Sequence, residues 1–289
     1  LVFGLAALSG LVQPSEIVVR NSLIGDSIPK NLFMKATSFS RISQDTARIF
    51  GALVGAGLFS WLGLGVAYIF VVIVYIVSLA LTFGVSRAHP RRDNYSKEEI
   101  SEPGTSLYYE LKEGLSYIRN SGPVFAIVCL AFLANLTAFP VTHGLMPYIA
   151  KDIMSLDENG LGQLLAAFSC GAVIGSLILA ATPSQKYASK LMIVNLVVWY
   201  VTLAIFSLVG SKTSGLLALL FVGIAHSFAM ASMSVALLGC TNELVRGRVM
   251  GVRVLAIYGV PLGLLGSGFL IEHLGYKNFM VTYVLIGII

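Results

Sequence analysis

Long apolar runs alternate with short polar segments along almost the whole chain, and this pattern predicts a series of membrane-spanning helices. The hydrocarbon core of a bilayer takes about 20 apolar residues per helix, and a backbone inside it must satisfy its own hydrogen bonds. Each run is therefore predicted to be helical. The predicted spans cover residues 1–19, 37–62, 66–85, 124–145, 161–181, 191–209, 216–240, 252–271 and 279–289.

One long polar stretch, from Arg87 to Gly122, interrupts this pattern. We interpret it as a linker, residues 87–122, between an N-terminal helical unit at 1–86 and a C-terminal unit at 123–289. Within the linker, residues 105–119 are predicted to form an amphipathic helix that lies along the membrane. Its apolar positions recur at helical spacing: Leu107, Tyr108, Leu111, Leu115 and Ile118.

The composition excludes a soluble domain. The chain is 56% hydrophobic and 11% charged, with a mean hydropathy of +0.85. Values this far from the soluble average define an integral membrane protein. The net charge of +5 is interpreted as a consequence of membrane topology, and no nucleic-acid partner is predicted from it.

Basic residues concentrate in alternate loops, which predicts the orientation of the chain. Lys and Arg accumulate on the cytoplasmic face of membrane proteins. The linker and the loops near residues 30, 188 and 248 carry most of them, whereas the opposite side has only Lys151, Lys212 and Lys277. We expect a multi-pass protein of the cell membrane, inner or plasma, with linker 87–122 in the cytoplasm. The basic loops also suit contact with anionic lipid headgroups.

The usual signatures of enzymes and metal sites are missing from the sequence. Cys129, Cys170 and Cys240 stand singly in separate apolar runs, a pattern that favours buried packing over a disulfide or a metal site. Residues 210–213 lack the adjacent Gly-Lys of a phosphate-binding loop. We therefore predict no catalytic residue, no metal and no cofactor, and we do not expect an enzyme.

Glycine and proline mark positions where the helices are predicted to pack closely or bend. Small residues let helices approach in lipid, where packing drives association. Static packing and a sliding interface are both compatible with the glycine pairs. Pro140 and Pro261 are expected to kink their spans. The glycine pairs are Gly51 with Gly55, Gly171 with Gly175, and Gly259 with Gly263.

Several charged residues are predicted to lie within or at the edge of spans. A charge at the bilayer centre costs about 2.5–3.5 kcal/mol on insertion scales, so it needs a partner or a water-filled cavity. Helical spacing allows pairing of Glu16 with Arg20, and of Asp45 with both Arg41 and Arg48. Structural ion pairing at the cytosolic boundary is one interpretation. The other is a proton or gating network that includes Glu16 or Asp45.

A second charged cluster lies in the turn from Asn242 to Gly251, where Arg246 and Arg248 follow Glu243 at the entry of a span. Such a cluster either anchors the helix on the cytoplasmic side or pairs with a neighbouring segment and holds one conformation closed. Both interpretations stay open.

A polar and Met-bearing helix face is the candidate lining of a substrate cavity. His226, Met230 and Met233 follow one another at helical spacing, and Asn135 with Thr137 is predicted to face the same cavity from another helix. Met side chains adapt to varied apolar ligands, and a histidine inside a span needs a polar partner and titrates near neutral pH. Ordinary core packing is the alternative for all of these residues.

Several segments together carry a resemblance to a known family. The run from Glu243 to Gly275, with Arg-Gly-Arg-Val-Met-Gly at 246–251, Pro261-Leu262-Gly263 and Leu274-Gly275, resembles the penultimate-helix signature of the major facilitator superfamily. More narrowly, it is similar to the branch of enterobactin and macrolide exporters called transmembrane secretion effectors. Segments 20–22, 47–51, 113–119, 145–148 and 160–162 agree in order and spacing.

The resemblance implies an all-α membrane protein with the major facilitator fold, in which two six-helix halves expose a central cavity alternately to each side. By that count, residues 1–86 hold helices 4–6 and residues 123–289 hold helices 7–12, the last one cut short. We therefore expect an N-terminally truncated fragment that does not transport by itself.

Three positions depart from the family pattern. Val18 and Ala52 stand where many members have proline, and residues 183–190 lack a common acidic residue. Because the missing proline at position 52 leaves the antiporter element incomplete, proton antiport is implied by the family alone.

The predicted function is secondary active transport: efflux of small amphipathic organic molecules, such as drugs or siderophores, driven by an ion gradient with protons as the first candidate. The alternatives are a lipid or lysolipid flippase of the same fold, and a transporter-like sensor that moves nothing. Expected partners are a small-molecule substrate, membrane lipids and protons, and the protein is expected to be a monomer.

Overall fold

A computed structural model describes residues 33–83, 107–181, 188–241 and 245–288. Within these ranges the secondary structure is entirely helical, and six helices are long and apolar enough to cross a membrane. This confirms the prediction of an all-α membrane protein. The predicted span 1–19 lies outside the described residues.

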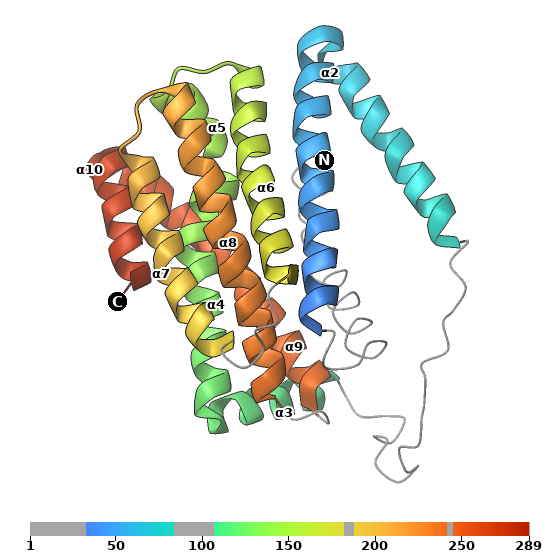
Figure 1. The fold of residues 1–289 in the computed structure, drawn as a ribbon, viewed down its shortest axis with the longest axis vertical. Helices are drawn as coiled ribbons and strands as arrows, with labels where there is room; N and C mark the ends of the chain where they lie inside the picture. Colours follow the sequence, from blue (N-terminus) through green and yellow to red (C-terminus); the bar gives the residue numbers. More distant parts are fainter. Residues whose placement is uncertain (1–32, 84–106, 182–187, 242–244, 289) are drawn as a thin grey trace.

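The helix α2 (Phe33–Phe83) contains two predicted spans joined at a sharp bend. A straight helix of 51 residues would be about 77 Å long, far more than the roughly 30 Å of a bilayer core. The bend occurs at Gly63, whose φ of 78° and ψ of 173° suit glycine because it lacks a Cβ. Figure 1 shows the first arm beside α6 and the second arm diverging from it. Almost all side chains of the second arm are exposed.

The next span changes its helical form at a proline. The helix α4 (Gly122–Phe139) passes into the π-helix η2 (Pro140–Gly144), followed by α5 (Met146–Tyr148) and the π-helix η3 (Ile149–Ile153). Pro140 has no N–H to donate to Leu136, and its ring crowds that carbonyl. The turn that follows Pro140 is wide: the Leu145 N–H donates to the Pro140 carbonyl, five residues earlier, over 2.8 Å. The predicted irregularity at Pro140 is confirmed as a π-turn.

Three consecutive spans form the centre of the bundle: α6 (Glu158–Ala181), α7 (Ala188–Ser207) and α8 (Lys212–Cys240). α8 packs against both α6 and α7. At the α6–α8 crossing, a Cβ added to Gly171 would lie 2.0 Å from the Leu220 carbonyl oxygen, and one added to Gly223 would lie 2.0 Å from that of Phe168. The predicted close packing is therefore confirmed at Gly171. A Cβ on Gly51 or Gly55 would meet no described atom within 4 Å.

The C-terminal segment combines α9 (Arg246–Leu255), the short 3₁₀ helix η5 (Ala256–Tyr258) and α10 (Gly259–Ile288). The 3₁₀ segment lies just before Pro261, as expected for a proline-distorted helix. α10 bends at Gly275, with φ of 77°, between the predicted spans 252–271 and 279–289. Its first half packs against α4, where a Cβ on Gly263 would lie 2.0 Å from the Leu136 carbonyl oxygen.

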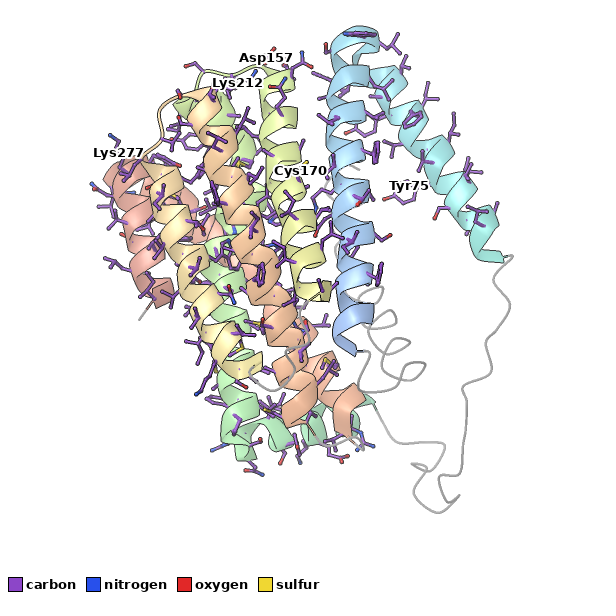
Figure 2. The ribbon with its side chains drawn as sticks, viewed as in Figure 1. Tyr75, Asp157, Cys170, Lys212 and Lys277 are labelled. Atoms are coloured by element: carbon purple, nitrogen blue, oxygen red, sulfur yellow. The ribbon has the colours of Figure 1, made fainter. Side chains whose placement is uncertain are left out.

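The predicted amphipathic linker helix is α3 (Leu107–Asn120). It lies across one end of the bundle (Figure 1) and packs against α9 and α4. Ile118 and Gly114 are buried there, whereas Leu115 is 60% exposed. The helix is confirmed, and of its two apolar positions with described side chains, Ile118 faces the bundle and Leu115 faces outward. Figure 2 shows Lys212 and Lys277 at the end opposite α3.

The expectation that the cysteines are buried was wrong at two positions. Cys129 and Cys240 are exposed and Cys170 is half-buried. In a protein whose outer surface faces lipid, an apolar side chain gains little from being inside rather than outside, because lipid tails are as apolar as the core. The apolar run therefore does not determine which face a cysteine occupies.

Candidate functional site

A carboxylate and a guanidinium on α2 form the centre of the candidate site. Arg48 Nη1 donates to Asp45 Oδ1 over 3.0 Å, at the predicted helical spacing. The Asp45 side chain is 8% exposed and that of Arg48 is 40% exposed. A buried carboxylate requires such a partner, because an isolated charge in a low-dielectric environment is costly. Arg41 also lies on α2, but its side chain is outside the described set.

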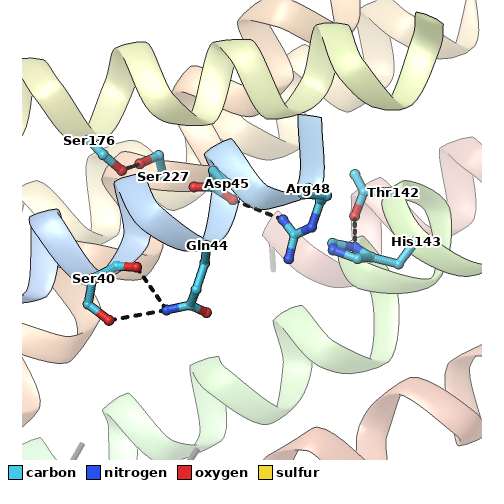
Figure 3. A network of polar contacts seen from close by, with 8 residues as sticks. All are labelled: Ser40, Gln44, Asp45, Arg48, Thr142, His143, Ser176 and Ser227. Carbon is cyan, nitrogen blue, oxygen red and sulfur yellow. Dashed lines mark hydrogen bonds and ion pairs between the residues drawn. The ribbon is translucent and has the colours of Figure 1, made fainter. Parts of the chain in front are cut away.

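This ion pair faces residues from three other helical segments (Figure 3). In Figure 3, Asp45 is drawn on the side of α2 toward Ser176 of α6 and Ser227 of α8, whose hydroxyl oxygens are 2.6 Å apart. The Arg48 side chain extends on the other side toward His143 in η2. The pair therefore lies at the interface between α2 and the C-terminal helices. Gln44, the residue before Asp45, donates to the carbonyl oxygen of Ser40, one turn earlier on α2, over 3.1 Å.

His143 owes its position to the π-turn. It is the fourth residue of η2, and its Nδ1 lies 2.9 Å from the Thr142 hydroxyl. Its ring centroid is 5.2 Å from that of Phe139 and 5.8 Å from that of Phe168. The residue is nevertheless exposed. The His143 imidazole thus packs against aromatic rings on one side and is exposed on the other, near the Arg48 guanidinium of α2.

Behind His143, an aromatic cluster closes the bundle around His226. The His226 ring lies 4.8 Å from Trp199, 5.2 Å from Phe168 and 5.4 Å from Phe139, measured between centroids. His226 is 4% exposed and Trp199 is fully buried. The two histidine rings are 6.4 Å apart. This cluster is packed core, and its exposed edge is His143.

The other predicted cavity residues are distributed through the same bundle. Met230 and Met233 follow His226 on α8 and are buried. Thr137 is 2.6 Å from the Tyr200 hydroxyl on α7. Asn135 donates to the Ala131 carbonyl over 2.7 Å and packs close to Gly259 of α10. The structure brings Thr137 toward the aromatic cluster through Tyr200, and it places Asn135 on the side of α4 that packs against α10.

A second ion pair fixes the end of the bundle where α3 lies. Arg248 Nη1 is 2.5 Å from Glu113 Oε1, and Arg253 donates to the Ser234 hydroxyl over 3.2 Å. The sequence analysis singled out Arg248 but not Glu113 as its partner. Arg246 belongs to α9, although its side chain is outside the described set. Glu16, Arg20 and Glu243 lie outside the described residues.

Several residues of the site were missed by the sequence analysis: His143, Thr142, Ser176, Ser227, Trp199 and Tyr200. A usable signal existed only for His143, because it follows Pro140 by three residues and a proline-distorted turn often carries function. The serines and aromatic residues are frequent in any apolar helix. Within the described residues, no three His, Cys, Asp or Glu side chains are grouped to hold a metal ion.

The helices and their bends define a multi-pass helical membrane protein. Residues 3–286 match the family of transmembrane secretion effectors. The chain therefore belongs to this family of the major facilitator superfamily. No curated protein matches the chain.

Proposed function

We propose that the protein exports small amphipathic organic molecules across the cell membrane and that an inward flow of protons drives the export. The family supports membrane transport. The observation that carries the proton-driven part is the buried Asp45 carboxylate, paired with Arg48 inside a membrane-spanning helix that packs on the other half of the bundle.

A carboxylate in this position has two stable forms. Ionised, Asp45 satisfies Arg48 over 3.0 Å. Protonated, it becomes neutral and the ion pair is lost, so Arg48 must find water or another acceptor. Proton binding therefore changes the electrostatics of the surface that α2 presents to α6, α8 and η2. A transporter needs this link between a bound proton and the packing of two halves.

The substrate site in this proposal lies among the aromatic cluster and the neighbouring Met230, Met233, Thr137 and Asn135. Aromatic and Met side chains accept varied apolar groups, and the few polar atoms orient them. In the proposed orientation, the α3 end is cytoplasmic, in agreement with the positive-inside rule. Movement of α2 away from α6 and η2 would expose this region to one side.

The test is transport by the purified full-length protein in liposomes. With an imposed pH gradient, export of a fluorescent amphipathic cation is expected. Asp45→Asn should reduce gradient-driven flux at least tenfold, because the amide cannot exchange a proton, and should retain substrate exchange without a gradient. Asp157→Asn is the matched control: Asp157 is exposed at the far end and accepts the Gly160 N–H over 2.8 Å, a role that Asn can keep.

Three results contradict the proposal in different ways. Unchanged coupling in Asp45→Asn removes Asp45 from the proton path. Lipid translocation that needs no gradient identifies a flippase instead. Neither flux nor translocation, in protein shown to be folded, identifies a transporter-like sensor.

A further inference from the structure

We propose that His143 is a proton-binding group that controls the contact between η2 and α2, and that Arg48 is the charge that responds to it. The inference rests on the proposed proton-driven transport and extends it from Asp45 to a second residue, on a different helix. It is carried by the juxtaposition of an exposed imidazole and a guanidinium from separate parts of the chain (Figure 3).

The geometry leaves both groups able to respond to a proton. Asp45 holds Arg48 at Nη1, and the Arg48 guanidinium extends toward His143. The His143 ring engages Thr142 through Nδ1 at 2.9 Å. Because the residue is exposed, the imidazole can take up a proton without disturbing the packed cluster.

The groups that face His143 explain why its protonation acts on α2 rather than on the other helices. From α2, the facing charges are Arg48 and, behind it, Asp45. From α8, the titratable neighbour is His226, which is buried 6.4 Å away. From α6 and α4, the neighbours are the apolar rings of Phe168 and Phe139. From α10, Leu264 packs at the adjacent Gly144. Among these described neighbours, Arg48 is the permanent cation.

A protonated His143 therefore places a second positive charge beside Arg48. Like charges at close range repel, most strongly where water is scarce. The aromatic rings of Phe139 and Phe168 prevent the His143 side chain from moving into the bundle. The repulsion is therefore reduced by movement of α2 away from η2. Neutral His143 permits the contact seen in this structure. Proton binding and separation of α2 are thus coupled, and each favours the other.

The test is the pH dependence of a distance in the full-length protein, measured without substrate and without a gradient. Spin labels are placed by Phe50→Cys on α2 and Val197→Cys on α7, both exposed positions, after the native cysteines, among them Cys129, Cys170 and Cys240, are changed to serine. The α2–α7 distance is expected to increase as the pH is lowered from about 8 to about 4, a range that covers the titration of an imidazole beside a cation. His143→Gln should abolish the change, because Gln can still hydrogen-bond but does not titrate.

Two further variants give the proposal independent tests. Arg48→Gln should raise the pH midpoint by about 1 unit, because the proton is no longer added beside a cation, whereas Arg48→Lys should leave the midpoint nearly unchanged. His273→Gln is the matched control. His273 is exposed on α10 and its Nδ1 contacts the Phe269 carbonyl, remote from α2, so the titration should persist.

The proposal is overturned if the α2–α7 distance does not change with pH. It is also overturned if the change survives in His143→Gln. In that case, loss of the change in His226→Gln or Asp45→Asn would identify the group that titrates instead. If His143→Gln does not fold, an unmoved midpoint in Arg48→Gln overturns it equally. A normal distance titration without gradient-driven flux refutes the proposed transport but keeps this inference. Gradient-driven flux without a pH-dependent distance refutes this inference but keeps the proposed transport.

Discussion

Glu113 of α3 forms an ion pair with Arg248 of α9, with 2.5 Å between their charged atoms. The pair joins the linker helix to the segment that enters the last two spans. Beside it, a Cβ on Gly114 would lie 3.1 Å from the Arg248 carbonyl oxygen. The ion pair and the close helix contact thus fix α3 on the bundle at the same point.

Charge reversal at this pair gives the first prediction. Glu113→Arg or Arg248→Glu alone should lower the melting temperature and loosen α3, measured as faster proteolysis near residues 107–120. The double variant should recover most of the loss, because the opposite charges are again adjacent. The expected coupling is small, about 0.2–1 kcal/mol, since both side chains are partly exposed. Additive effects in the double variant would show that the pair contributes nothing.

The close crossing of α6 and α8 gives the second prediction. Gly223→Ala should destabilise the protein by about 1–3 kcal/mol, because the new methyl would overlap the Phe168 carbonyl and force the helices apart. Gly239→Ala is the control on the same helix, where an added Cβ meets no described atom within 4 Å. That change should be neutral or slightly stabilising, since alanine favours helix. Equal melting temperatures for the two variants would contradict the crossing.

The bend of α2 gives the third prediction. Gly63→Ala should cost about 1–3 kcal/mol, because φ of 78° with ψ of 173° belongs to a region that essentially only glycine occupies. Gly65→Ala, two residues later and equally open to a Cβ, should leave the melting temperature unchanged or raised. Thermal unfolding in detergent measures both. A Gly63→Ala variant as stable as Gly65→Ala would place the bend elsewhere.

The fourth prediction concerns the buried hydroxyl of Tyr200. Tyr200→Phe removes the contact with Thr137 at 2.6 Å and should cost about 0.5–1.5 kcal/mol. The cost stays modest because Thr137 still donates to the Leu133 carbonyl over 2.8 Å. Tyr258→Phe, at an exposed position, should change stability by less than the error of the measurement. A larger loss at Tyr258 would indicate that its hydroxyl has a partner of its own.

Within the described residues, the sequence was sufficient to predict the apolar spans and the breaks between them. Apolar run length determines where a helix crosses the bilayer, and the two gaps predicted near residues 63 and 275 fall at glycines with positive φ. The Asp45–Arg48 pair was also predictable, because helical spacing is a local property. In each case, the physical cause lies within a few residues of its effect.

The environment of His143 was not predictable in the same way. Its neighbours Arg48, Phe168 and His226 come from three other helices, and apolar periodicity says nothing of which faces meet. In lipid, the inward and outward faces of a helix are both apolar. The sequence therefore indicated that His226 and Met230 share a face, but it did not show that the face is closed by Trp199.

The π-turn at Pro140–Gly144 has one more consequence. A π-turn holds one residue more than an α-turn, and each residue of an α-helix advances the side chains by about 100°. The direction in which the His143 side chain points therefore depends on the number of residues in the turn as well as on their chemistry. Deletion of Val141 would close the turn to ordinary α form and rotate the imidazole away from Arg48 while every functional side chain remains in the chain.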